Sequence, residues 1–225
     1  MIYGVHPQAV IFDLDGVLIE SEQVWDEVRR GLATDAGRPW PPDATSALQG
    51  MSTPEWSRYL VDVVGVPGPP EKVAETVIQR VGERYRAHLA LLPGAVETVR
   101  ALADRWPLGV ASSSPTRLIE LVLATAGVAD RFQVAVSSEE VARGKPAPDV
   151  YLAAASRLGA DPTRCVAVED STNGLRAAVA AGMVLVAAPN AEYPPADDAL
   201  ALAAVVVPGV AGVTVELIES LPEPG

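Results

Sequence analysis

Two aspartates, two positions apart, follow a short apolar run near the start of the chain. The run Ala9–Phe12 leads directly into Asp13-Leu14-Asp15-Gly16-Val17. A buried carboxylate is destabilising unless it is paired or bound to a metal, so this pair indicates chemistry. A plain turn is the alternative interpretation, because Asp and Gly both favour turns. A calcium loop of the EF-hand type does not fit, because its glycine must follow three spaced ligands.

A second acidic pair follows another apolar run. Glu169 and Asp170 come after Cys165–Val168 and precede Ser171-Thr172-Asn173-Gly174. Asp170 could simply favour the start of the next helix through the helix dipole. Two acidic pairs at two strand ends of one sheet, however, form an oxygen-rich site, and Mg²⁺ suits one or two carboxylates plus a substrate phosphate. We therefore predict a magnesium site.

Groups that can hold a phosphate lie between the two acidic pairs. Ser112, Ser113 and Ser114 follow Leu108–Ala111, and hydroxyls with free backbone N–H groups at a helix start form an anion site. Ordinary capping by Ser114, with proline at the first helical position, is the alternative. Lys145 precedes a proline, which holds it extended, and an exposed loop lysine is its alternative. Together these groups are the parts of a phosphoryl-transfer site.

These residues need elements that bring several strand ends together. Runs that are apolar on both faces are typical of buried parallel strands, and they occur at Ala9–Phe12, Leu108–Ala111, Gln133–Val136, Cys165–Val168, Val184–Ala187 and Val205–Val207. Helical patterns alternate with them at Pro93–Asp104, Pro115–Ala126, Asp149–Leu158 and Asn173–Ala181. This alternation predicts an α/β fold with a doubly wound parallel sheet, a Rossmann-like core that holds ligands at the carboxyl ends of its strands.

Residues 20–91 break the alternation, because they carry helical patterns and no convincing strand. Trp25, Val28, Leu32 and Ala36 share one helical face, Thr53-Pro54 opens a helix that reaches about Val64, and a further helix covers Glu71–Ala90. We predict a small all-helical domain at residues 20–91, inserted after the first strand. Residues 1–19 and 92–225 would then form the α/β core.

Composition excludes several classes of protein. Lys+Arg 17 against Asp+Glu 29 gives a net charge of -12, and a chain without a basic patch repels nucleic acid. The single cysteine, Cys165, cannot form an internal disulfide and is expected to be a buried, inert thiol. The first residues show no basic segment followed by a cleavage site, so export is not expected. The longest uncharged stretch is interrupted by Pro208, Gly209 and Gly212, so a membrane span is not expected either. We expect a cytoplasmic protein with no nucleic-acid or membrane partner.

Four segments, in this order, resemble the motifs of the haloacid dehalogenase superfamily. They are Phe12–Val17, the strand-end Ser112, Gly144–Asp149 and Val168–Gly174. The helical insertion is similar to the cap that this superfamily carries after its first motif. Through Glu20–Asp26 and Ala111–Pro115, the chain most resembles the sugar-phosphate phosphatases of the β-phosphoglucomutase-like branch, such as 2-deoxyglucose-6-phosphatase.

The resemblance implies a role for each matching residue. Asp13 would be the nucleophile that forms an aspartyl phosphate, and Asp15 would protonate the leaving alkoxide and then activate water. Ser112, Ser113 and Lys145 would bind the phosphoryl oxygens, with Ser112 and Lys145 also stabilising the transition state.

The resemblance also implies a ligand set for the metal. Mg²⁺ would bind Asp13, the backbone carbonyl of Asp15 and Asp170, with Glu169 behind them as a supporting member of the metal site. The cap would close over the site and read the leaving group.

Two cap residues are candidate substrate contacts. Gly50 lies between cap helices and Trp25 lies in the first of them; a plain turn and helix packing are the respective alternatives. Relatives that are β-phosphoglucomutases carry a histidine where this chain has Trp25, and an indole N–H cannot accept a proton. We therefore expect a magnesium-dependent phosphatase of small phosphorylated metabolites, sugar phosphates first, acting as a monomer or weak homodimer. A phosphosugar mutase and a non-catalytic phosphometabolite-binding protein are the alternatives.

Overall fold

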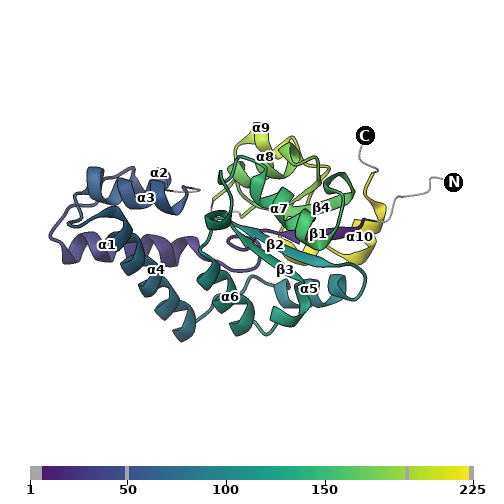
Figure 1. Cartoon of the computed structure of the whole chain (residues 1–225), viewed down its shortest axis with the longest axis horizontal. Coiled ribbons are helices and arrows are strands. Elements are labelled where there is room, and N and C mark those ends of the chain that lie inside the picture. Colours follow the sequence, from purple (N-terminus) through teal and green to yellow (C-terminus); the bar gives the residue numbers. More distant parts are fainter. Residues whose placement is uncertain (1–6, 49–50, 191–192, 223–225) are drawn as a thin grey trace.

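Six parallel strands form a sheet in the order β3-β2-β1-β4-β5-β6 (Figure 1). The computed structural model describes residues 7–48, 51–190 and 193–222. The strands are β1 (Ala9–Phe12), β2 (Leu108–Ser112), β3 (Val134–Ser137), β4 (Cys165–Glu169), β5 (Val184–Ala187) and β6 (Val205–Val206). The strand order reverses direction at β1, which confirms the predicted doubly wound α/β fold.

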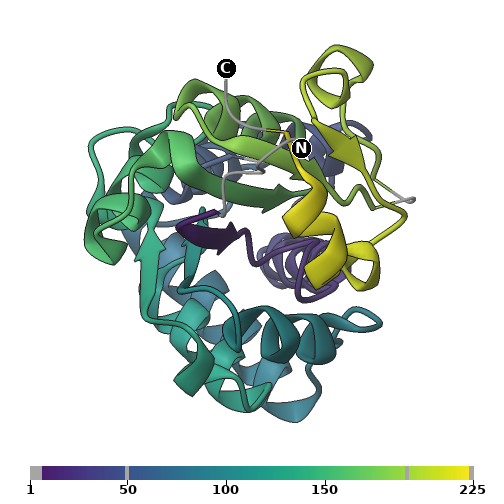
Figure 2. The same cartoon turned by 90° about the vertical axis from the view of Figure 1, so that its right-hand side faces the viewer.

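Helices cover both faces of this sheet, because successive strand residues point to opposite sides. Val10 and Phe12 face α5 (Ala95–Ala103), α6 (Thr116–Thr125) and α10 (Val215–Ser220). Ala9 and Ile11 face α7 (Asp149–Leu158), α8 (Thr172–Ala180) and α9 (Asp197–Leu200). Figure 2 shows the green helices α7 and α8 and the teal helices α5 and α6 on opposite sides of the strands. Short 3₁₀ turns at Ala129–Arg131, Ser138–Glu140, Pro162–Arg164 and Val210–Gly212 complete the connections.

Two strands run one residue further than their apolar runs predicted. Ser112 pairs with Ser137, and Glu169 pairs with Ala187, so both polar residues belong to the ladder. The third strand is shifted by one residue for the same reason, because its polar end residue Ser137 is paired. The last strand is shorter than predicted and ends at Val206.

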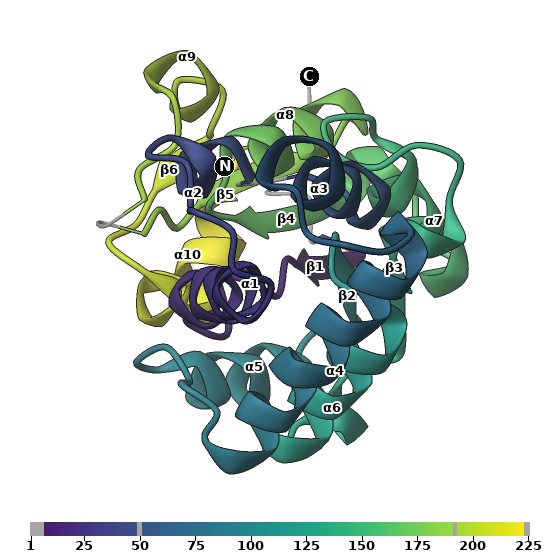
Figure 3. The ribbon, with the colours of Figure 1, turned by 90° about the vertical axis from the view of Figure 1, so that its left-hand side faces the viewer.

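The helices inserted after β1 lie together beyond one end of the sheet (Figures 1 and 3). They are α1 (Glu22–Asp35), α2 (Ala44–Leu48), α3 (Thr53–Tyr59), a π-helical turn (Leu60–Val64) and α4 (Pro70–Ala87). Helix α4 packs on α1 and α3 and also on α6 of the core. Ile19 and Leu91, at the two ends of the insertion, pair as an antiparallel bridge. The division into domains at residues 20 and 91 stays a prediction.

The helix expected from residue 53 to about 64 has two parts. Helix α3 begins after Ser52, whose backbone N–H donates to the Glu55 carboxylate at 2.8 Å. The last residues, Leu60–Val64, form the π-helical turn, which ends at Gly65 with a φ of 82°. In α1 the residues that are buried are Trp25, Val28, Arg29 and Ala33, whereas the predicted Leu32 and Ala36 are only partly buried.

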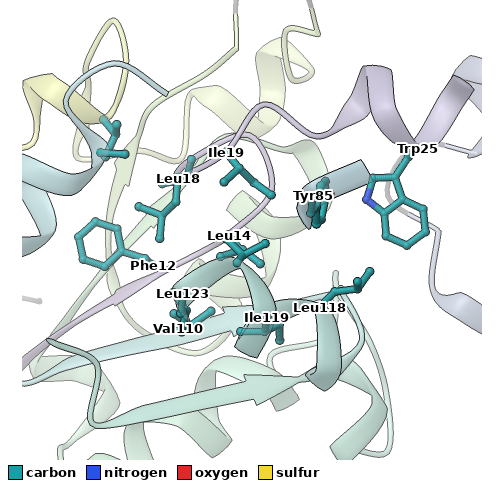
Figure 4. Packing of buried hydrophobic residues seen from close by; sticks show 14 of the residues in the cluster. Phe12, Leu14, Leu18, Ile19, Trp25, Tyr85, Val110, Leu118, Ile119 and Leu123 are labelled. Carbon is teal, nitrogen blue, oxygen red and sulfur yellow. The ribbon is translucent and has the colours of Figure 1, made fainter. Parts of the chain in front are cut away.

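One apolar cluster joins the sheet to the cap and fixes the segment that follows β1 (Figure 4). Leu14, Leu18 and Ile19 pack in it together with Phe12, and each is almost completely buried. Figure 4 shows them beside Val110, Leu118, Ile119 and Leu123, with Tyr85 and Trp25 of the cap at the edge. This packing holds the backbone that carries Asp13 and Asp15.

Two further expectations concern Cys165 and membrane spans. Cys165 is the first residue of β4 and is buried as predicted, and burial raises the pKa of its thiol to about 11. Among the described residues, none of the helices combines the length and apolar character that crossing a membrane requires.

Candidate active site

The carboxyl ends of β1 and β4 bring the predicted acidic residues together. The register pairs Phe12 with Val168, and the Asp13 backbone N–H donates to the Val168 carbonyl at 2.9 Å. Asp13 and Glu169 therefore lie side by side at adjacent strand ends, and both are buried. A turn at the surface, which was the alternative for Asp13, does not describe this position.

Lys145 reaches this pair from the loop after β3. Its Nζ donates to Oδ1 of Asp13 at 2.7 Å and to Oε1 of Glu169 at 2.5 Å, and its side chain is 4% exposed. The ammonium also lies 5.0 Å from the ring centre of Tyr151. Burial alone would lower the pKa of Lys145, but the two carboxylates outweigh it and raise that pKa above its ordinary value. Lys145 is a fixed, charged member of the site and not an exposed loop lysine.

Glu169 uses both carboxylate oxygens in hydrogen bonds. Besides Lys145, Oε1 accepts from the Tyr151 hydroxyl at 3.2 Å. Oε2 accepts from the backbone N–H of Asp170 at 2.9 Å and from the backbone N–H and hydroxyl of Ser171 at 3.0 and 3.1 Å. A Cβ at Gly174 would overlap this carboxylate, so the close approach requires glycine. Glu169 thus holds both the lysine and the loop that carries Asp170.

Within the cluster of Asp13, Glu169 and Asp170, the carboxylates with capacity left for a cation are Asp13 and Asp170. Asp13, Glu169 and Asp170 each offer an oxygen within 4.8 Å of the others, and Oδ1 of Asp170 is buried without a partner among the described residues. Gly16, with a φ of 79°, leaves room for the Asp170 carboxylate, which a Cβ there would overlap.

The raised pKa values of these carboxylates also favour a bound cation. Burial, together with Glu169 and Asp15, raises the pKa of Asp13 to about 8 although Lys145 opposes it. Burial and the neighbouring carboxylates also raise the pKa of Asp170. Carboxylates kept apart from water in this way are stabilised by a hard divalent cation, so the residues present fit Mg²⁺.

Asp15 is oriented by the serines at the end of β2. Its Oδ2 accepts from the Ser114 hydroxyl at 2.7 Å and from the Ser112 hydroxyl at 3.3 Å. Ser112 is fully buried, and its Oγ also accepts the Ser114 N–H at 3.0 Å. The Ser114 hydroxyl therefore serves Asp15 and not the helix, and the N-cap of α6 is Pro115, one residue later than the capping interpretation. Oδ1 of Asp15 is buried without a partner among the described residues.

A cavity of about 100 Å³ lies between these strand ends and the cap. Of the residues predicted for the site, those that line it are Asp13, Asp15, Trp25, Ser113, Lys145 and Asp170. Ser112 and Glu169 lie behind this lining, where they contact Asp15 and Lys145. Gly50 lies outside the described residues, although Leu48 and Met51 on either side line the cavity. The structure thus gathers the described candidates around one cavity.

Several cap residues that sequence reasoning did not assign to the site line the same cavity, and three of them carry large or charged side chains. Glu22 and Arg29 come from α1, and Trp56 comes from α3. Glu22 and Arg29 share a helix face with Trp25 at spacings of three and four residues, a signal hidden by the apolar face that was assigned to Trp25 and Val28. The cap arginines Arg58, Arg84 and Arg86 are exposed.

Comparison with known proteins identifies the family. The sequence model of the haloacid dehalogenase-like hydrolases matches residues 7–182. The chain belongs to the haloacid dehalogenase-like hydrolase family. The resemblance found in the four sequence motifs is therefore confirmed, and the protein is a hydrolase of this family.

Relatives of this haloacid dehalogenase-like hydrolase include sugar phosphatases. Hexitol phosphatase B of Escherichia coli is 38% identical over 195 residues, which cover 83% of this chain and 86% of the relative. The fructose-1-phosphate phosphatase of Escherichia coli is 30% identical and covers 77% of this chain and 92% of its own length. Among solved structures, CbbY from Rhodobacter sphaeroides in complex with phosphate is similar at a TM-score of 0.81 and 26% identity, over 91% of this chain and 95% of that one. A β-phosphoglucomutase from Clostridium difficile shares the fold, at a TM-score of 0.80 and 24% identity over 95% and 96% of the two chains.

Proposed function

We propose that this hydrolase is a magnesium-dependent phosphatase of small phosphate monoesters, with sugar phosphates as the expected substrates. It acts through an aspartyl phosphate that forms on Asp13. The observation that carries the proposal is the convergence of Asp13, Asp15 and Lys145 on one cavity, with Lys145 hydrogen-bonded to Asp13 at 2.7 Å. The names of its relatives, a hexitol phosphatase and a fructose-1-phosphate phosphatase, support a phosphorylated sugar or polyol as the substrate.

In the first step, a carboxylate oxygen of Asp13 attacks phosphorus and the bond from phosphorus to the substrate oxygen breaks. Asp15 gives its proton to the leaving alkoxide. Ser112 and Ser114 hold the Asp15 carboxylate through their hydroxyls, which keeps it at the cavity. In the second step, Asp15 takes a proton from water, and the water oxygen attacks phosphorus, which frees Asp13 and releases inorganic phosphate.

The charges around Asp13 assist both steps. The ammonium of Lys145 donates a 2.7 Å hydrogen bond to Asp13, the nucleophile, and its positive charge offsets negative charge on the phosphoryl oxygens. Glu169 fixes that ammonium from the other side. A magnesium ion, which Asp13 and Asp170 and, by the family resemblance, the Asp15 carbonyl would hold, supplies further positive charge for the phosphoryl oxygens when bound.

Trp25 favours hydrolysis over the mutase alternative. Its ring is buried and lines the cavity, so it both packs in the cap and faces the site. The indole N–H can donate a hydrogen bond but cannot take the proton of a second sugar hydroxyl. Water activated by Asp15 is then the acceptor of the phosphoryl group.

A phosphate-release screen tests the proposal. The panel holds phosphorylated sugars, polyols, nucleosides and glycolate, each measured with Mg²⁺ and with excess chelator, and Asp13→Asn serves as the inactive control. We expect release from sugar or polyol phosphates that requires both Mg²⁺ and Asp13. Binding of these compounds without any release of phosphate would instead indicate the non-catalytic alternative. The cytoplasmic location and the monomer or weak homodimer stay predictions.

A further inference from the structure

The cap contributes a buried arginine to the lining of the cavity. Arg29 is 8% exposed, and its guanidinium carbon lies 4.9 Å from the ring centre of Trp25 and 5.1 Å from that of Trp56. The two rings are themselves in contact, with centres 5.9 Å apart. The Nε of Arg29 is shielded from solvent and has no partner among the described residues. The phosphatase mechanism above makes no use of this cation.

Glu22 lines the same cavity, two helical turns before Arg29 on one face of α1. Burial lowers the pKa of Arg29 to about 10. Among the neighbouring acids, Glu22 does most to raise that pKa again. The next acid, Asp26, is held elsewhere, by Arg30 at 2.5 Å and by the Thr45 hydroxyl at 2.6 Å. One face of α1 thus presents two groups to the cavity, the N–H donors of the Arg29 guanidinium and the acceptor oxygens of the Glu22 carboxylate.

The charges around the cavity decide what these groups can bind. Four carboxylates line it, from Asp13, Asp15, Glu22 and Asp170, against the two cations Lys145 and Arg29. A divalent cation and a phosphate dianion offset each other, so the loaded site stays acidic. A second anionic group beside Glu22 would be repelled in this poorly solvated space. The group that fits both Arg29 and Glu22 is a hydroxyl, which accepts from one and donates to the other.

We propose that Arg29 and Glu22 are specificity-determining residues that bind hydroxyl groups of an uncharged polyol chain, while Trp25 and Trp56 cover its C–H face. This inference rests on the phosphatase function proposed above and narrows its substrates. It selects monophosphates whose remaining part is neutral and rich in hydroxyls. It excludes substrates with a second phosphate or a carboxylate at the far end.

The test compares kcat/KM for four substrates: a linear hexitol phosphate, a hexose bisphosphate, a phosphorylated sugar acid and p-nitrophenyl phosphate. The wild type should prefer the hexitol phosphate over the bisphosphate and the sugar acid by at least about tenfold, since Glu22 repels a second anionic group in this poorly solvated space. Arg29→Met keeps the apolar stem and removes the donors. It should lose about 10- to 100-fold on the hexitol phosphate and under about threefold on the nitrophenyl ester, which has no hydroxyls to bind. Glu22→Gln should lose about tenfold in the same selective way.

Two controls separate binding from folding and turnover. Arg58→Met changes an exposed arginine of α3 and should leave all four values unchanged. Calorimetry with Asp13→Asn, with and without Arg29→Met, measures the Kd of the hexitol phosphate without hydrolysis, and the second substitution should weaken it by the factor seen in kcat/KM.

Three outcomes would overturn the inference. A wild-type preference for the bisphosphate or the sugar acid would show that Arg29 binds a second anion. An equal loss on all four substrates in Arg29→Met, together with an unselective Glu22→Gln, would show a structural role. An unchanged Kd in the calorimetric pair would remove Arg29 from binding. Absence of phosphate release by the wild type from every substrate, while the calorimetric difference persists, would overturn the proposed phosphatase function and leave the binding roles standing.

Discussion

Gly174→Ala should destabilise the protein although alanine is the better helix former. Gly174 is the third residue of α8, where helix propensity alone favours alanine by up to about 1 kcal/mol. The added Cβ would overlap the carboxylate of Glu169, whose side chain is completely buried. That carboxylate cannot move without loosening its bonds to Lys145, Tyr151 and the backbone of Asp170.

The expected magnitude follows from these contacts. Disrupting a buried ion pair costs about 3–5 kcal/mol, and the propensity gain returns at most about 1 kcal/mol of this. The net loss is therefore about 2–4 kcal/mol in the free energy of unfolding. For a chain of this size, each kcal/mol shifts Tm by about 2–4 °C, so Tm should fall by roughly 5–15 °C. Phosphatase activity should fall as well, because Lys145 loses the group that fixes it.

A matched glycine supplies the control. Gly31 lies inside α1, and a Cβ there would meet none of the described atoms outside its own helix within 4 Å, so Gly31→Ala should stabilise the protein slightly. Thermal and urea unfolding of both variants, followed by circular dichroism, measure the two effects. A Gly174→Ala protein that melts at or above the wild type would refute the argument that Glu169 fills this space.

Three further predictions concern catalysis and protonation. Asp13→Asn should reduce phosphatase activity to background. Asp15→Asn should lower activity about 10²–10⁴-fold on sugar phosphates and much less on p-nitrophenyl phosphate, because the nitrophenolate leaving group needs little protonation. Equal losses on both substrates in steady-state kinetics would argue against Asp15 as the acid. In chelated protein, the pKa of Asp13 is raised from 3.8 to about 8 and that of Asp170 is raised as well, so the folded state keeps protons that the unfolded chain has lost. Thermal unfolding should therefore show Tm falling as the pH rises from about 4 to about 8, and Mg²⁺ should reduce this fall. A rise of Tm over this interval would contradict the buried carboxylate cluster. Because Trp25 cannot act as a base, phosphorus NMR of a hexose phosphate supplied with a hexose bisphosphate should show free phosphate and little isomerised sugar phosphate, whereas the reverse would identify a mutase.

The sheet and its site were largely readable from the sequence because buried parallel strands are apolar on both faces. The bounds of β1 and β5 are those of their apolar runs. Strands β2 and β4 end on Ser112 and Glu169, whose polarity hides that their backbones still pair. Hydropathy depends on the side chain, whereas strand pairing depends on backbone hydrogen bonds. A prediction from hydropathy therefore ends a strand one residue too early where its last residue is polar and functional.

Contacts between distant segments could not be read in the same way. The burial of Arg29 depends on Trp56, which arrives from a different helix. The sequence neighbours of Ser114 fit a helix cap, yet its hydroxyl donates to Asp15, which lies in the segment after β1. Local patterns specify elements, and the partners of polar side chains are specified only when those elements pack.

The bridge between Ile19 and Leu91 gives the cap the topology of a detachable module. Besides this pairing, the Glu20 N–H donates to the Ala90 carbonyl at 2.8 Å, and the Leu92 N–H donates to the Leu18 carbonyl at 3.0 Å. Paired residues of this kind lie about 5 Å apart, so the intervening segment leaves the core and returns to it at almost one point. In its connection to the core, the insertion therefore resembles a hairpin loop, because its two ends are paired. A segment of different length or chemistry that keeps these backbone pairs, and the contact of α4 with α6, would enter and leave the core at the same point beside Asp13.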